Sequence, residues 1–127
     1  MKILILNGSP RPNGNTAAMV RAYAEGASEA GHTVHIVNVC QKKIAGCLAC
    51  AINRIYALDK PKKLRKAALI LSSGSDLVYS GAIFEYQNSF LQYLHLEDCG
   101  MFAAHGEENQ SPELLERLRA AGRNLKD

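Results

Sequence analysis

The sequence contains no tryptophan, only three phenylalanines, and no long uninterrupted apolar run. A helix that spans a membrane needs about 20 predominantly apolar residues, and no segment of this 127-residue sequence reaches that length. The first apolar run, residues 3–6, is also much shorter than the core of a signal peptide, and a turn sequence follows it at once. These absences predict a soluble, cytoplasmic protein with no membrane partner.

The sequence also lacks a strong imbalance of charge. Its 15 Lys and Arg residues and 12 Asp and Glu residues give a formal net charge of +3 at pH 7. The basic cluster at residues 60–66 is typical of the solvated entry to a strand. A nucleic-acid interface requires a broader basic face with interleaved aromatic side chains, so we expect no nucleic-acid partner.

What the sequence does contain is a regular alternation of apolar and amphipathic segments. Strands are expected at residues 2–7, 33–39, 66–72 and 99–104, and helices at residues 16–30, 51–58, 81–96 and from residue 112 onward. The continuous apolar run of the first segment fits a strand that is buried on both faces of a parallel sheet. Because alternating strands and helices are typical of such sheets, we predict an α/β fold in one domain, residues 1–127.

Short polar residues and glycine mark the expected helix ends. Asn15 is a candidate N-cap for the first helix, and Gly31 is its expected stop. Ser111 is expected to cap the last helix, with Pro112 at its first position, where the missing N–H costs little. An apolar face on that helix is formed by Leu114, Leu115, Leu118 and Ala121.

The stretch Gly-Ser-Pro-Arg-Pro-Asn-Gly-Asn-Thr, residues 8–16, joins the first strand to the first helix. Ligands of parallel α/β sheets bind beyond the carboxyl ends of the strands, where a helix N-terminus offers unpaired N–H groups to an anion. Arg11 adds a guanidinium suited to phosphate, and Ser9, Asn15 and Thr16 add short polar side chains. A plain loop of this kind usually has only about 2–6 residues, so we predict a phosphate site, with a plain connection as the alternative.

Residues 3–20, which include this stretch, resemble the start of flavodoxin-like NAD(P)H-dependent FMN reductases and the related iron–sulfur flavoproteins. Their signature is an apolar strand, then Gly-Ser-Pro-Arg, then Gly-Asn-Thr at the start of a helix. The resemblance implies an oxidoreductase that passes hydride from NAD(P)H through FMN to a small acceptor such as a flavin or a quinone. Since the cofactor carries this chemistry, no catalytic side chain is required. The implied ligands of the FMN phosphate are Ser9, Arg11, Asn15 and Thr16.

Two further segments are expected at the same edge of the sheet. The resemblance favours contact between the flavin ring and Gly74 and Ser75, with Tyr79 stacked on the ring. The alternative is a polar loop whose tyrosine packs on the next helix. His105 follows the fourth strand and is a candidate proton donor, although histidines in solvated loops are commoner.

The chain is shorter than the family that it resembles by about one helix and one strand, at least roughly 20 residues, near residues 50 and 51. The family's sheet has the order 2-1-3-4-5, whereas we expect a flavodoxin-like, doubly wound sheet of four strands in the order 2-1-3-4. The resemblance implies that the absent segment includes the loop that contacts the flavin ring, so the FMN site is incomplete there. A natural deletion, an engineered deletion and an omitted stretch of sequence fit this pattern equally.

The shortening also leaves one face of the expected sheet thinly covered. A helix at residues 51–58 hides less apolar surface than a full helix, and exposed apolar patches favour association. We therefore expect a homo-oligomer, and specifically a dimer. The alternative function is a catalytically inactive module that binds phosphate or self-associates.

Three of the four cysteines, Cys40, Cys47 and Cys50, lie in the loop after the second strand. A zinc ion or an iron–sulfur cluster needs four ligands, and Cys99 is expected at the opposite, N-terminal edge of the sheet, so no metal site is predicted. The Cys-x-x-Cys pair of Cys47 and Cys50 is a redox candidate if a helix N-terminus lowers a thiol pKa. A pair of free thiols is the favoured alternative.

Overall fold

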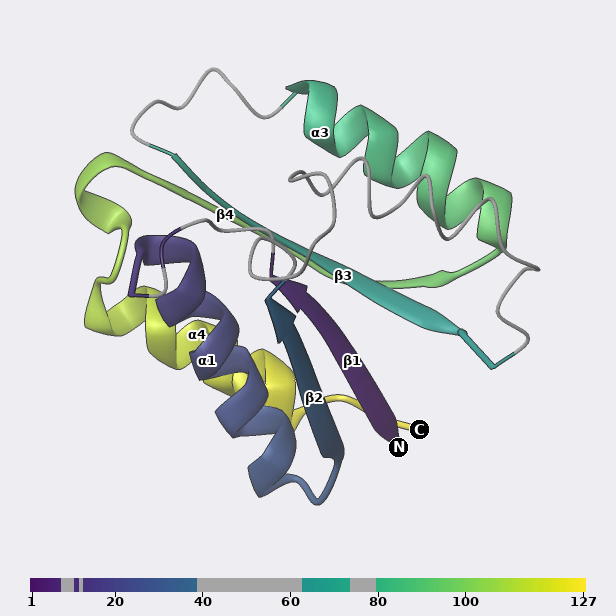
Figure 1. Ribbon diagram of the computed structural model, residues 1–127, viewed down its shortest axis with the longest axis horizontal. Helices are drawn as coiled ribbons and strands as arrows, with labels where there is room; N and C mark the ends of the chain where they lie inside the picture. The colour runs from purple at the N-terminus through teal and green to yellow at the C-terminus, as the bar shows by residue number, and fades with distance from the viewer. Residues whose placement is uncertain (8–10, 12, 39–62, 74–79) are drawn as a thin grey trace.

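The computed structural model describes residues 1–7, 11, 13–38, 63–73 and 80–127 (Figure 1). Its elements, in chain order, are β1 (Lys2–Asn7), α1 (Asn15–Glu29), β2 (Thr33–Asn38), β3 (Lys66–Ser73), α3 (Ser80–Phe84), a π-helix (Glu85–Gln92), β4 (Glu97–His105), a 3-10 helix (Gly106–Glu108) and α4 (Pro112–Arg123). The four expected strands are therefore confirmed to within two residues at each end. The helix expected at residues 51–58 lies outside the described residues.

The strands pair in parallel, two by two. β1 pairs with β2 from Lys2 opposite Thr33 onward, and β3 pairs with β4 from Lys66 opposite Glu97 onward. Within the described residues no ladder of hydrogen bonds joins β1 to β3, and Figure 1 shows the two pairs meeting at an angle. The parallel α/β class is confirmed. A single sheet in the order 2-1-3-4 is not confirmed, because the described strands form two sheets of two strands.

The two strand pairs are linked at both ends. At the carboxyl ends, the hydroxyl oxygen of Thr16 in α1 lies 2.5 Å from that of Ser72 in β3. At the amino ends, Lys66 Nζ of β3 donates to the carbonyl oxygen of Lys126 at 2.8 Å. Side-chain contacts of α1 and of the C-terminal residues thus hold together strand pairs that share no backbone ladder.

The core lies where α1 and α4 cross, on one side of the strands. A Cβ atom added to Gly26 would lie 1.9 Å from the carbonyl oxygen of Arg119, and one added to Gly122 would lie 2.3 Å from that of Tyr23. The two helix backbones therefore touch at positions that only glycine can occupy. The buried cluster around this crossing consists of Met19, Ala22, Tyr23, Ala104, Leu114 and Leu118.

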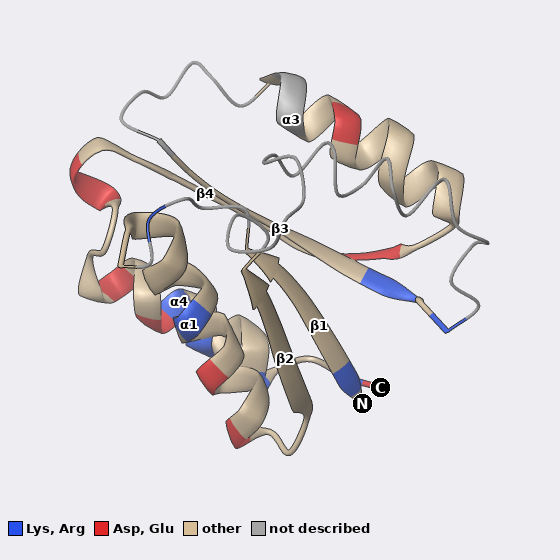
Figure 2. Ribbon diagram, in the orientation of Figure 1, with Lys and Arg blue, Asp and Glu red and all other residues tan. Residues whose placement is uncertain are grey.

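Basic and acidic residues occur on both of these helices (Figure 2), and ion pairs join them at the exposed margin. Arg119 Nε lies 2.9 Å from a carboxylate oxygen of Glu25, and Arg123 Nε lies 2.5 Å from one of Glu29. Arg123 also contacts Glu116 of its own helix at 2.9 Å. Exposed pairs of this kind contribute little stability, so they orient α4 on α1 while the buried cluster supplies most of the stabilisation.

The opposite face of β1 is poorly covered. Ile5 packs against the buried cluster, whereas Leu4, on the other face of the strand, is 63% exposed. The expectation that β1 is buried on both faces is therefore wrong. The reason is that α1, the described helix with substantial contacts to β1 and β2, covers one face only.

The helix expected at residues 81–96 begins at Ser80 and widens into the π-helix from Glu85 onward. Tyr86 of the π-helix is buried, and its hydroxyl donates to Asp98 Oδ1 at 3.0 Å. The same oxygen accepts the N–H of Gly100 at 2.9 Å, in the bulge where β4 shifts register against β3. One carboxylate thus fixes both the bulge and the helix that packs on it.

The expected ends of α1 and α4 are confirmed in two places. Gly31 follows the last turn of α1 with a left-handed φ of 88°, a conformation that costs glycine little. Ser111 caps α4, since its Oγ accepts the N–H of Leu114 at 3.2 Å. None of the helices in the described ranges is long and apolar enough to cross a membrane.

Candidate phosphate-binding site

The site is built on the carboxyl ends of β1 and β2. Asn7, which is 5% exposed at the end of β1, donates from Nδ2 to Oδ1 of Asn38 at the end of β2, over 2.9 Å. The bond joins the last residues of the two strands, directly before the segments that leave them. Sequence reasoning assigned no role to either residue, although a polar residue that ends an apolar strand is the signal that marks them.

The first turn of α1 begins just beyond this pair. Its N-cap residue is Gly14, which offers no side-chain acceptor, and its first turn contains no acidic residue. The N–H of Gly14 donates to the carbonyl oxygen of Arg11 at 3.3 Å, which closes a turn before the helix. The first N–H groups of a helix have no partner within the helix, so this end is suited to an anion.

Asn15 does not cap α1, so that expectation is wrong. It is the first helical residue rather than the residue before the helix, and its Oδ1 accepts from Gln110 Nε2 at 2.6 Å. The amide oxygen that would otherwise reach a backbone N–H of α1 is thereby engaged by a residue from the loop after β4.

Thr16 and Arg11 lie at the same end of α1. The Thr16 hydroxyl contacts Ser72 of β3, and because a hydroxyl both donates and accepts, a bond donated by Ser72 leaves the Thr16 proton for an anion. Arg11 is exposed and is the first residue of the turn that the Gly14 N–H closes. The structure therefore brings Arg11, Asn15 and Thr16 to one helix end, while Ser9, Gly74, Ser75 and Tyr79 lie outside the described residues.

The loop after β4 reaches this edge as well. His105 ends β4 and is partly exposed, with Nδ1 lying 3.9 Å from a carboxylate oxygen of Glu108. Gln110 follows in a left-handed conformation, with φ of 65°. No sequence pattern points to Gln110, because its partner Asn15 is 95 residues away in the chain.

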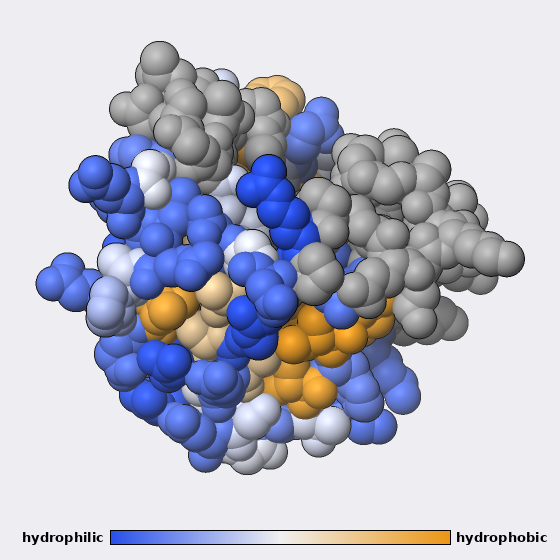
Figure 3. Space-filling view, turned by 60° about the vertical axis from the view of Figure 1, so that its left-hand side comes forward, coloured by the Kyte–Doolittle hydropathy of each residue, from blue (hydrophilic) through white to orange (hydrophobic). Residues whose placement is uncertain are grey.

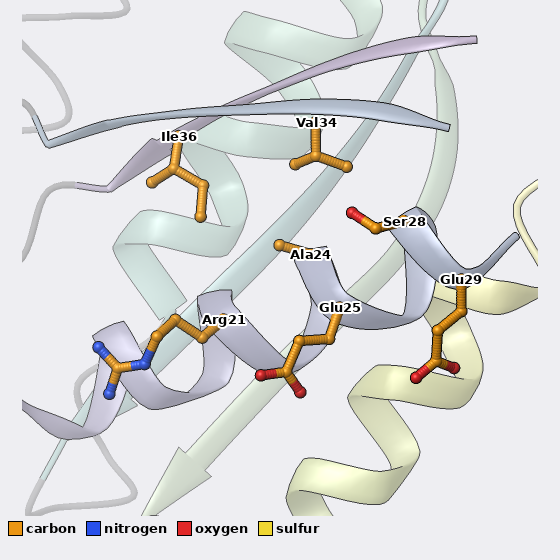
Figure 4. A pocket seen from close by; sticks show the side chains of 7 residues that line it. All are labelled: Arg21, Ala24, Glu25, Ser28, Glu29, Val34 and Ile36. Carbon is orange, nitrogen blue, oxygen red and sulfur yellow. The ribbon is translucent and has the colours of Figure 1, made fainter. Parts of the chain in front are cut away.

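A groove lies elsewhere on α1. An open groove of about 440 Å³ runs between α1 and β2, lined by Arg21, Ala24, Glu25, Ser28, Glu29, Val34 and Ile36. Figure 4 shows Val34 and Ile36 pointing from β2 toward α1, whereas the charged side chains point away. Figure 3 shows apolar surface exposed among hydrophilic side chains on one face of the molecule. The groove begins beyond the first turn of α1, so it is separate from the candidate phosphate site.

Cys99 lies near the amino end of β4, as expected. Burial, followed by the Glu97 carboxylate, raises the pKa of its thiol above the ordinary value, so Cys99 is not an activated thiolate at neutral pH. Within the part of the chain that the structure describes, no three His, Cys, Asp or Glu residues are grouped to hold a metal ion. Cys40, Cys47 and Cys50 lie outside that part.

Comparisons with known proteins bear on this helix end. The family model described as NADPH-dependent FMN reductase matches residues 1–75. The iron-sulfur flavoprotein MJ1083 of Methanocaldococcus jannaschii is 34% identical over 88 residues, which cover 64% of this chain and 46% of that protein. The chain thus matches less than half the length of this curated relative.

One solved structure is similar throughout. NAD(P)H:quinone oxidoreductase from Methanothermobacter marburgensis superposes with a TM-score of 0.76 at 17% identity, over 100% of this chain and 96% of that chain. At this identity the likeness concerns the fold. Together with the parallel strand pairs, it places the chain among flavodoxin-like α/β structures.

Proposed function

Because the chain belongs to the NADPH-dependent FMN reductase family, whose model matches residues 1–75, we propose that it binds FMN with the phosphate at the N-terminus of α1. The reaction would be hydride transfer from NAD(P)H to a small acceptor, a flavin or a quinone. One observation carries the proposal: the first turn of α1 has neither a side-chain acceptor at its N-cap Gly14 nor an acidic residue. A doubly charged phosphate fits such a helix end.

Each residue of the site has a separate task in this proposal. The guanidinium of Arg11 offsets phosphate charge with charge-assisted hydrogen bonds. The Thr16 hydroxyl donates to a phosphate oxygen while Ser72 holds it in place. Ser9, from the same loop, supplies a further donor. Gly74, Ser75 and Tyr79 are proposed to contact the flavin ring.

Bound FMN would supply the hydride-accepting ring, so the chain's own residues bind and orient rather than attack. The pairs Asn7–Asn38 and Thr16–Ser72 fix the strand ends and the helix start from which the donors project. Fixed donors lose less entropy on binding than mobile ones. We also propose that the protein acts in the cytoplasm. We further propose that it forms a dimer, since Leu4 on β1 is 63% exposed.

The proposal is tested by titrating the purified protein with FMN and with riboflavin while following the visible spectrum. We expect FMN to bind at least about tenfold more tightly, because charge-assisted hydrogen bonds contribute about 1.5–3 kcal/mol each. If the two compounds bind with equal affinity, the phosphate does not contribute to binding and the proposed phosphate site is wrong. A protein that takes up no FMN overturns the FMN-dependent activity as well.

A second candidate is a module without redox activity that binds phosphate or associates with itself. The exposed apolar side chain of Leu4 and the match to less than half of the curated relative support it. FMN binding without NAD(P)H oxidation distinguishes this candidate from an active reductase.

A further inference from the structure

The loop between β4 and α4 sends one side chain to the start of α1. Gln110 Nε2 donates to Asn15 Oδ1 at 2.6 Å, across 95 residues of sequence. The loop is anchored next to this contact, because the N–H of Ser111 donates to the carbonyl oxygen of Glu108 at 3.0 Å and Ser111 caps α4. Gln110 therefore contacts the predicted phosphate site from the loop before α4, and not from the loop between β1 and α1 that forms the site.

The residue that makes the contact, Gln110, has an unfavourable backbone conformation. Its φ of 65° is left-handed, a region in which a non-glycine residue costs of the order of 1–3 kcal/mol. Neither a glycine nor an asparagine, the residues that tolerate this conformation best, occupies the position. A long amide side chain is therefore present where the local backbone would favour a different residue.

The contact fixes the orientation of the Asn15 side-chain amide, with its oxygen toward Gln110. An asparagine side chain has an accepting oxygen and a donating nitrogen, and the N–H of Gln110 pairs only with the oxygen. With the oxygen engaged, the Nδ2 group is the end of the amide that remains to meet an anion. The engaged oxygen is also kept from the N–H groups in the first turn of α1, where it would compete with phosphate.

We propose that Gln110 is a positioning residue for the anion at the N-terminus of α1. It holds Asn15 with its donor end available and its acceptor end withdrawn. The inference rests on the proposed function, because the anion it concerns is the phosphate of FMN. It adds to the site a residue from the loop after β4 that acts through Asn15.

The test compares Gln110→Ala and Gln110→Gly in titrations with FMN and with riboflavin. Both variants are expected to weaken FMN binding by about threefold to tenfold, the effect of one ordinary hydrogen bond, and to leave riboflavin binding unchanged. Gln110→Gly is expected to melt at a higher temperature than Gln110→Ala, because glycine relieves the left-handed strain. A loss of FMN affinity that is shared by variants of different stability is not an effect of folding.

A double-mutant cycle shows whether Gln110 acts through Asn15. In the Asn15→Ala background, Gln110→Ala is expected to have no further effect on FMN affinity. Gln87→Ala, a change of the same type at an exposed position of the π-helix, is the control and is expected to leave both affinities unchanged.

The outcomes separate the two proposals. Suppose that the unaltered protein binds FMN. If the Gln110 variants bind FMN as tightly, or if their affinities for FMN and riboflavin fall equally, the role of Gln110 is overturned, whereas the phosphate site stands. If Asn15→Ala and Gln110→Ala lower the FMN affinity additively, Gln110 does not act through Asn15. An unaltered protein that binds neither FMN nor inorganic phosphate overturns the proposed site and the role of Gln110 together.

Discussion

The hydroxyl oxygens of Thr16 and Ser72 lie 2.5 Å apart and join residues that are 56 positions apart in the sequence. Thr16 belongs to the first turn of α1, which follows β1, and Ser72 lies near the carboxyl end of β3. Since no ladder of hydrogen bonds joins β1 to β3 in the described ranges, this contact provides a polar link between β3 and the helix that follows β1. It also lies at the proposed phosphate site, so it connects the stability of the fold to binding.

Removal of this link is expected to lower stability. Ser72→Ala should reduce the free energy of unfolding by about 1 kcal/mol, the contribution of a typical hydrogen bond, and should weaken FMN binding because Thr16 loses its support. Urea denaturation measures the first effect and FMN titration the second. Ser28→Ala, at an exposed position of α1, should change neither, and equal effects of the two substitutions contradict the linking role.

The crossing of α1 and α4 makes a second prediction. In most helix interiors, replacing glycine by alanine is stabilising by about 1 kcal/mol. At Gly122 a Cβ atom would lie 2.3 Å from the carbonyl oxygen of Tyr23 and 2.7 Å from the backbone N of Ala27. Neither atom belongs to a flexible side chain, so we expect Gly122→Ala to destabilise the protein by about 3 kcal/mol, the upper range for overpacking.

The matched control for this substitution is Gly106→Ala. Gly106 has a φ of 57°, and a Cβ atom added there meets nothing within 4 Å. Its replacement therefore carries a backbone cost of about 1 kcal/mol without a steric clash. Thermal unfolding that ranks Gly106→Ala as the more destabilising change contradicts the close contact of the two helices.

Local sequence patterns were sufficient for the elements and for the family. The apolar run before Asn7, the glycine at residue 31 and the Ser111–Pro112 pair each specify a strand or a helix end through interactions within a few residues. The family resemblance of residues 3–20 is confirmed by the family match over residues 1–75. The phosphate ligands that it implies stay predictions.

Features that depend on distant partners were not predictable from these patterns. Asn15 is an acceptable N-cap by residue type, and its actual partner, Gln110, is set by how α4 packs on α1. The separation of β1 from β3 depends on how the two strand pairs pack together, which the pattern within one strand does not specify. The π-helix differs from an α-helix by a small change of pitch, which the apolar spacing at residues 81–96 does not resolve.

The buried tyrosine of α1 makes the stability dependent on pH in the alkaline range. Burial, with a smaller effect of Cys99, raises the pKa of Tyr23 from its ordinary 10.0 to about 12. The folded protein then retains a proton that the unfolded chain releases near pH 10. This contribution to stability is complete below pH 10 and is lost as the pH rises from 10 to 12.

Urea midpoints of the unaltered protein and of Tyr23→Phe, measured between pH 9 and 12, test this dependence. The variant keeps the ring that packs against Phe102, whose centroid lies 6.0 Å from that of Tyr23. We expect the unaltered protein to lose stability relative to the variant above pH 10. Two curves that stay parallel over the whole range show that Tyr23 does not titrate as inferred.

The exposed face of β1 predicts how the protein associates. Leu4 is 63% exposed, so Leu4→Lys should change the stability of the monomer by less than about 0.5 kcal/mol. If the dimer forms through this face, the same substitution should weaken dimerisation at least about tenfold, because a desolvated lysine is costly. Leu4→Met, which keeps the side chain apolar, is the control in sedimentation equilibrium, and equal dissociation constants for both variants exclude this face.

The exposed guanidinium before α1 provides the most direct test of the phosphate site. Arg11→Ala should weaken FMN binding about tenfold or more, the effect of one charge-assisted hydrogen bond, and should leave riboflavin binding unchanged because riboflavin carries no phosphate. The loss should shrink as the salt concentration rises, since salt screens exposed charges. Titrations of both compounds at low and high salt measure these effects.

Arg117→Ala removes the same charge from an exposed position of α4 and serves as the control. A general effect of net charge lowers FMN affinity equally in the two variants, because both lose one positive charge. A local effect appears in Arg11→Ala alone, since the Debye length is about 8 Å at physiological salt and limits the range of an exposed charge. Equal losses in the two variants, or a loss for riboflavin as large as that for FMN, remove Arg11 from the phosphate site.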